Sequence, residues 1–146
     1  MRRFLQRPRQ FLGSLRRSRD GASFVEFSLV APFLVLLTLG IVDFGRVMWT
    51  STTIEHVARE AARYAALHGA GAKVEATAAS TQTYATDRAT GLKASDMQVG
   101  VTYLGGSNAS GSSVTVSVTY DFNLMLAAIL GFDPIQLDSE STFIIL

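Results

Sequence analysis

The longest uninterrupted hydrophobic pattern in the chain runs from Phe27 to Val42. These sixteen residues carry no charge and are rich in leucine, valine, isoleucine and phenylalanine. At about 1.5 Å per residue they cover about 24 Å, which is less than the hydrocarbon core of about 30 Å, so the flanking residues must supply the rest. The pattern therefore predicts a transmembrane helix over about 24–49, with Pro32 producing a kink inside it.

Helical spacing continues beyond this run. Apolar positions such as Ile54, Ala61 and Ala65 recur at intervals of three, four or seven residues among good helix formers. The glycines that begin at Gly69 end the pattern. One helix is expected over 22–68, about 70 Å long, with its second half outside the membrane.

After the long helix the sequence predicts a second helix and then strands. Residues 73–90 read as a second helix, and 97–104 and 113–122 alternate β-branched or aromatic with polar residues around a glycine-rich and serine-rich loop, as in a β-hairpin. Residues 123–132 form a short apolar stretch, either a helix or a packing loop, and 135–146 predict a third strand. The expected fold is α+β, with an antiparallel hairpin or three-stranded sheet.

Charge predicts the orientation of this arrangement. The first twenty residues hold seven arginines and one acid, a net of +6, and the remainder has a net of −5. Basic residues beside a transmembrane segment mark its cytoplasmic end, so we expect a single-pass protein whose domain over 69–146 is extracytoplasmic. The arginines stop where the apolar helix begins, which favours membrane topology over nucleic-acid binding. The chain has no cysteine and therefore no disulfide or thiolate site.

Short matches to catalytic and binding motifs carry little weight. Asp-Phe-Gly at 43–45 lacks the other kinase motifs, and the glycosylation sequon at Asn108 needs only to be a hairpin loop. His56 and Glu60 lie four residues apart, but two ligands without a third favour a solvated pair over a metal site. No nucleophile constellation or phosphate loop is present. We therefore predict no enzyme, no cofactor and no metal.

One charge in the opening stretch needs a specific explanation. Glu26 stands at the entrance of the apolar run, where a carboxylate costs about 2.5–3.5 kcal/mol on insertion scales. If the chain were cut between Gly21 and Ala22, a new α-amino group would lie at the same depth. In an assembly of staggered helices, that group on one subunit and Glu26 on the next could pair directly.

These residues resemble a known processing site. Gly21, four further residues, Glu26 and the aromatic Phe27 resemble the site of Flp-type (type IVb) prepilins, and the wider pattern over 21–66 is similar to the TadE/TadG-like family of tight-adherence pilus pseudopilins. The resemblance implies that a membrane-embedded prepilin peptidase removes residues 1–21 and leaves Ala22 as the new N-terminus.

The resemblance also implies roles for individual residues and for the whole chain. Glu26 and Phe27 would serve assembly or recognition, and Pro32 would match the proline of the family's apolar helix. Because the mature chain exceeds the small major Flp pilin by a whole domain, it points to a minor pseudopilin. The implied partners are the prepilin peptidase, other pseudopilins, the Flp pilin and the Tad inner-membrane assembly platform. The implied location is the bacterial inner membrane or the base or tip of the pilus, with roles in pilus biogenesis, adhesion and biofilm formation.

Two alternatives stay open at the level of the sequence. The first is an uncleaved, signal-anchored periplasmic scaffold protein of the cell envelope, which explains the arginines and the apolar run but not Glu26. The second and weaker is a membrane-bound hydrolase whose activity would depend on one of three acids, Asp96, Asp121 or Asp133.

Overall fold

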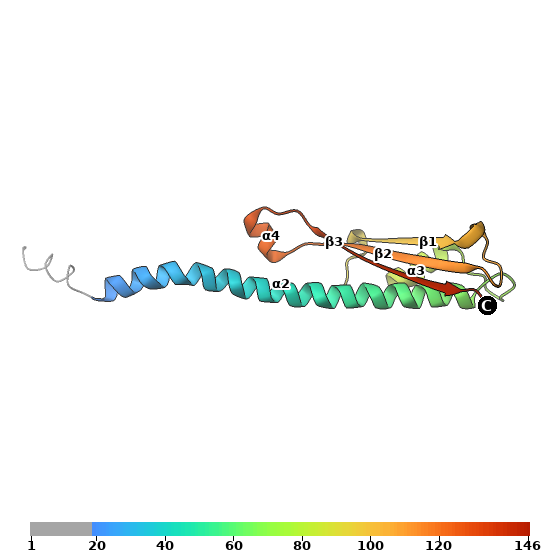
Figure 1. Ribbon diagram of the computed structural model, residues 1–146, viewed down its shortest axis with the longest axis horizontal. Helices are drawn as coiled ribbons and strands as arrows, with labels where there is room; N and C mark the ends of the chain where they lie inside the picture. Colours follow the sequence, from blue (N-terminus) through green and yellow to red (C-terminus); the bar gives the residue numbers. More distant parts are fainter. Residues whose placement is uncertain (1–18) are drawn as a thin grey trace, which may run out of the picture. The chain divides into compact units, whose positions relative to one another are not determined.

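The computed structural model describes residues 19–146, so most of the predicted leader over 1–21 lies outside the described residues (Figure 1). The described part is a mixed α+β chain, as predicted. Residues up to Leu39 and residues Gly40–Leu146 form separate compact units. The helices and strands are α2 (Arg19–Leu67), α3 (Ala78–Arg88), β1 (Met97–Tyr103), β2 (Ser113–Phe122), α4 (Met125–Leu130) and β3 (Ile135–Ile144), with single-turn 3₁₀ helices η1 (Ala94–Asp96) and η2 (Leu104–Gly106) at either end of β1.

The long helix predicted over 22–68 is confirmed as α2. It continues through Pro32 without a break and ends at Leu67, two residues before the first of the predicted stop glycines. Gly69 is buried where the chain leaves the helix, and a Cβ there would collide with the side chain of Ile145. A glycine is therefore required at this position by packing.

The three strands form one antiparallel sheet in the order β1-β2-β3. Val116 at the centre of β2 pairs with Val101 of β1 and with Ser141 of β3. The predicted hairpin and third strand are confirmed, each ending within two residues of the expected position. The sheet is a meander because consecutive strands are also neighbours.

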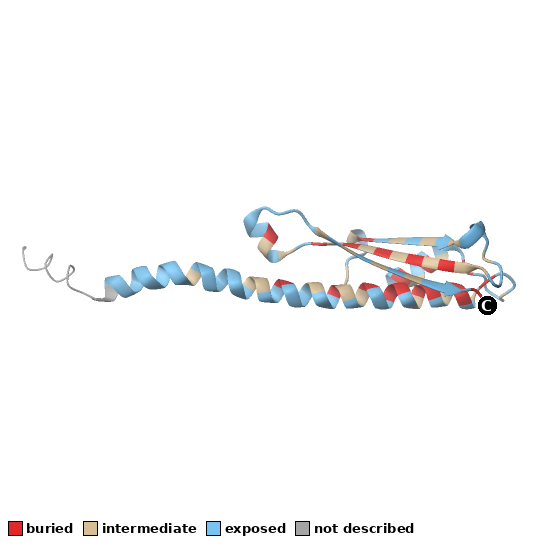
Figure 2. Cartoon of the chain, in the orientation of Figure 1, coloured by how far each residue is buried: buried red, intermediate tan, exposed pale blue. Residues whose placement is uncertain are grey.

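The sheet has one apolar and one polar face. Every second residue of β2, beginning at Val114, is buried, while the residues between them are threonines, serines and one aspartate. On the polar face, the hydroxyls of Thr115 and Thr142 share a hydrogen bond of 2.8 Å across β2 and β3. The buried face packs on the second half of α2, where Figure 2 shows a stripe of buried residues.

Small residues on α2 form most of the helix side of this core. Ile54 and Val57 are fully buried, and they are followed on the same stripe by five buried alanines, Ala58, Ala61, Ala62, Ala65 and Ala66. Alanine lets a helix backbone approach its neighbour closely and also favours the helix. The alanine-rich stretch that predicted a helix therefore also supplies the packing surface for the sheet.

The second predicted helix is shorter than expected. It was predicted over 73–90, but α3 begins at Ala78, because Thr77 has an extended backbone and caps the helix. The hydroxyl of Thr77 accepts from the Ser80 amide at 3.1 Å, and the Ser80 hydroxyl accepts from the Thr77 amide at 2.9 Å. This reciprocal capping box fixes the start of the helix.

Candidate functional site

The first part of α2 presents apolar side chains outward. From Gly21 to Val42 almost every residue is exposed, and α2 is the helix of the described chain that is long and apolar enough to cross a membrane (Figure 2). Two of the three hydroxyls in this stretch donate to the carbonyls one turn earlier, Ser28 to Phe24 at 2.7 Å and Thr38 to Leu34 at 2.8 Å. Their protons are thus satisfied within the helix, as a hydrocarbon environment requires.

The predicted processing residues, Gly21 and Ala22, lie inside the first turns of α2 and are exposed. A Cβ built at Gly21 meets no atom within 4 Å, so the conformation of this chain alone would tolerate a side chain there. Any need for glycine at this position would therefore come from a partner.

The predicted assembly residues lie close by. Glu26 and Phe27 are exposed and are separated by about 100° around the helix. Within residues 21–146, whose side chains the structure describes, Glu26 makes no hydrogen bond or ion pair. Its carboxylate is thus available to a group outside the described chain.

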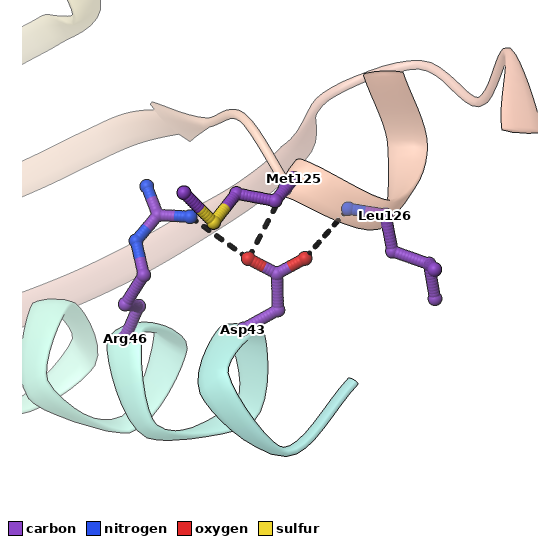
Figure 3. Close-up of polar contacts among 4 residues, drawn as sticks. All are labelled: Asp43, Arg46, Met125 and Leu126. Carbon is purple, nitrogen blue, oxygen red and sulfur yellow. Dashed lines mark hydrogen bonds and ion pairs between the residues drawn. The ribbon is translucent and has the colours of Figure 1, made fainter. Parts of the chain in front are cut away.

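A second carboxylate on α2 is fully engaged. Asp43, which is 2% exposed, accepts from the amides of Met125 at 3.1 Å and Leu126 at 2.8 Å, at the first turn of α4 (Figure 3). Arg46 donates to the same carboxylate at 2.8 Å, and its guanidinium lies 4.9 Å from the ring centre of Phe122. Asp43 therefore caps α4 and joins two segments that are 82 residues apart in the chain.

Sequence reasoning treated Asp43 only as part of a chance motif. Its signal was present, since it is the first charge after the apolar run and has Arg46 three residues later, a spacing that allows an ion pair on one helix face. The pattern could not reveal its main partners. They are backbone amides of a distant segment, and a backbone amide leaves no trace in residue type.

Part of α2 matches a known protein family. Residues 21–63 match the family model described as TadE-like protein. The N-terminal segment is TadE-like. No curated protein and no solved structure matches the chain.

The TadE-like segment begins at the predicted cleavage site and ends within the part of α2 that packs on the sheet. It includes Glu26, Phe27 and Pro32, and it also includes Asp43. The match agrees with the resemblance read from the sequence and indicates a protein associated with the Tad pilus. Helix α3 and the whole sheet lie outside it.

The two possible metal ligands in the TadE-like segment are not part of a larger cluster. Among the described residues, no group of three or more histidine, aspartate or glutamate side chains is placed to hold a metal ion. His56 is exposed, and Glu60 lies 4.0 Å from Arg88 of α3. This geometry makes Glu60 a surface ion-pair partner.

The three acids of the hydrolase alternative lie in different elements. Asp96 accepts from the Ser95 hydroxyl in η1, and Asp121 accepts from the Gln136 amide on the polar face of the sheet. Asp133 is exposed in the turn after α4. Their surroundings are those of ordinary surface carboxylates.

Asn108, the residue of the sequon, has a structural role. Its side-chain amide donates to the backbone carbonyl of Ala76 at 3.0 Å, and the backbone carbonyl of Asn108 accepts from the Ala70 amide at 2.9 Å. The hairpin loop is thereby tied to the segment that follows α2. A glycan on this nitrogen would displace the first contact, so the structural reading of Asn108 is favoured.

Proposed function

We propose that this chain is a minor pseudopilin of a Tad/Flp (type IVb) pilus, stored in the bacterial inner membrane and used in pilus biogenesis, adhesion and biofilm formation. The observation that carries the proposal is the TadE-like segment itself. It is an apolar, outward-facing helix that starts at the Gly21, Glu26, Phe27 pattern and continues into a folded domain. The proposed action is assembly and not catalysis.

Assembly would use the exposed carboxylate at the start of the helix. The prepilin peptidase would cut between Gly21 and Ala22, which leaves a cationic amino group four residues from Glu26. Glu26 of one subunit would then meet the amino terminus of a neighbouring pilin or pseudopilin. The support for this step is that Glu26 is exposed and has no partner within residues 21–146, although a carboxylate at the edge of a bilayer needs one.

The topology follows from the charge distribution. The arginine-rich leader would stay in the cytoplasm and the domain over 69–146 would lie in the periplasm. The polar outer face of the sheet suits an aqueous compartment. The proposed partners are the prepilin peptidase, other pseudopilins, the Flp pilin and the Tad inner-membrane platform.

Mass analysis of the membrane-extracted protein tests this function. We expect a chain that begins at Ala22 in cells with the prepilin peptidase and a chain that keeps residues 1–21 in cells without it. Gly21→Val should block cleavage because it places a branched side chain beside the scissile bond. Gly40→Val is the matched control, since a Cβ at this second helical glycine also meets nothing within 4 Å, and it should be processed normally.

The opposite result has a clear meaning. A chain that keeps residues 1–21 in both strains would overturn the pseudopilin proposal. It would leave the uncleaved, signal-anchored scaffold as the better description, and Glu26 would then need another partner.

A further inference from the structure

The connection between β2 and β3 has an unusual composition for a surface loop. We call residues 123–134, which include α4, the α4 loop. Its first ten residues, 123–132, carry no charge. Four large apolar side chains in it are about half exposed or more, Met125, Ile129, Leu130 and Phe132. Clustered exposed apolar side chains of this kind mark a surface that contacts another phase or molecule.

The α4 loop is held against α2 at one defined level. The Asp43 carboxylate accepts from two amides of the loop, and Ala127 packs inward, where it is 5% exposed. An open apolar hollow of about 250 Å³ lies between Phe44 and Val47 of α2 and Phe132 of the loop. The exposed apolar side chains of the loop are therefore displayed at the level of Asp43.

That level coincides with the end of the apolar span. Gly21–Val42 is 22 residues long, and at 1.5 Å per residue it covers about 33 Å, close to the hydrocarbon core of about 30 Å. Asp43 is the first charge after this span. Next to it, Ile41, Val42 and Phe44 are exposed on α2, and Phe44 lines the same hollow as Phe132, so exposed apolar side chains of α2 adjoin the loop.

A cation is placed at the same level. Arg46 is 43% exposed and uses one of its terminal nitrogens for Asp43, which leaves other donors of its guanidinium free to face a lipid phosphate. An apolar surface with a half-exposed arginine beside it matches the order of layers in a bilayer, hydrocarbon first and then headgroups.

We propose that the α4 loop is a second membrane-contacting element, which inserts Ile129, Leu130 and Phe132 into the interfacial layer of the bilayer on the domain's side. The lipid surface is the occupant because the loop adjoins exposed apolar residues of α2 at Asp43, the first charge after the uncharged run 27–42. The contact places the domain directly on the membrane and shortens the spanning segment to about 21–42, compared with the 24–49 predicted from the sequence. It requires that α2 crosses the bilayer, but neither cleavage at Gly21 nor pilus assembly.

The absence of cysteine from the chain allows a direct test with the full-length protein. In the Ile129→Cys variant, the cysteine is labelled with an environment-sensitive fluorophore. The protein is placed in vesicles of phosphatidylethanolamine and phosphatidylglycerol, and its emission is measured with and without nitroxide-labelled lipid. Val35→Cys in the apolar span is the positive control. Ser110→Cys, in the hairpin loop at the other end of the sheet from α4, is the negative control. All three positions are exposed, so the substitutions leave the core intact.

We expect the lipid nitroxide to remove most of the emission at positions 129 and 35 and none at position 110, at every protein-to-lipid ratio. Emission at position 129 that matches position 110 would overturn the proposal. Emission at position 129 that is not quenched by the nitroxide but changes on dilution with unlabelled protein would overturn the proposal in favour of contact with a second copy. No quenching at position 35 would overturn the membrane-spanning helix, and this proposal with it.

Discussion

Two carboxylates on α2 have opposite surroundings. Asp43 is buried, capped onto α4 and paired with Arg46, so its charge is satisfied within the chain. Glu26 is exposed at the start of the apolar span and is not satisfied by any group in residues 21–146. The first therefore serves the fold, and the second is the residue on which the proposed assembly depends.

At the residue scale we predict that Glu26→Ala leaves membrane insertion intact but impairs assembly. Removing the carboxylate makes insertion easier, by less than the about 2.5–3.5 kcal/mol that a charge costs at the centre of the bilayer, while the amino terminus of the neighbouring subunit loses its partner. If the pair contributes about 1.4 kcal/mol per contact, incorporation should fall about tenfold. Quantitative blotting of the membrane fraction and of the sheared pilus fraction measures both effects.

Glu55→Ala is the matched control for this variant, because Glu55 is an exposed glutamate on the same helix but beyond the apolar span. It should insert and assemble normally. Normal incorporation of the Glu26→Ala protein would show that the pairing between Glu26 and an amino terminus is wrong.

At the scale of elements, α4 depends on a side chain from another helix. It has six residues, and its N-cap residue, Leu124, has a side chain that cannot accept a hydrogen bond from the first turn. A helix of this length is not stable by itself in water. The Asp43 carboxylate takes over the capping role from outside, since it accepts from two of the amides that the first turn leaves without a helical partner.

We therefore predict that Asp43→Ala loosens α4 and leaves the sheet in place. The amides of Met125 and Leu126 lose their acceptors and should exchange with solvent faster, while the amides of β2 keep their protection because their partners lie in β1 and β3. Hydrogen exchange followed by mass spectrometry separates the two segments.

Asp133→Ala is the control for this experiment, since Asp133 is an exposed aspartate in the same loop. It should leave exchange in α4 unchanged. Unaltered protection of α4 in the Asp43→Ala protein would mean that packing of Ala127 and Leu126 holds the helix without its cap.

At the scale of the whole molecule, one helix serves two environments. The part of α2 before Val42 exposes apolar side chains and suits lipid, whereas from Ile54 onward its buried stripe forms the core with the sheet. A single-pass membrane protein with a C-terminal domain fits this division. The basic leader and the acidic remainder then predict which end lies on which side.

We predict that the leader is cytoplasmic and the domain periplasmic. Single-cysteine variants test this in spheroplasts that lack the prepilin peptidase, so that the leader is retained. A membrane-impermeant maleimide should label Ser110→Cys and leave Gln6→Cys unlabelled, and both should react after permeabilisation. Labelling of Gln6→Cys in intact spheroplasts would reverse the proposed orientation.

The sequence by itself determined the elements and their order. Three local patterns indicate which face of an element avoids water. They are the uninterrupted apolar run, the helical spacing of the alanines and the strict alternation in β2. For this reason α2, the hairpin and the third strand were predicted to within a few residues. The start of α3 was missed because the composition of residues 73–77 suits a helix. The helix begins only at Ala78, since Thr77 has an extended backbone and caps it with its hydroxyl.

Only the tertiary structure decided how distant segments meet. The partners of Asp43 are backbone amides 82 and 83 residues away, and those of Asn108 include the carbonyl of Ala76. Backbone groups are the same in every residue, so no pattern of side chains announces which of them will be paired. The stretch over 123–132 could be read only as a helix or a packing loop. Folding placed it beside Asp43 of α2, where its exposed side chains are available for the proposed membrane contact.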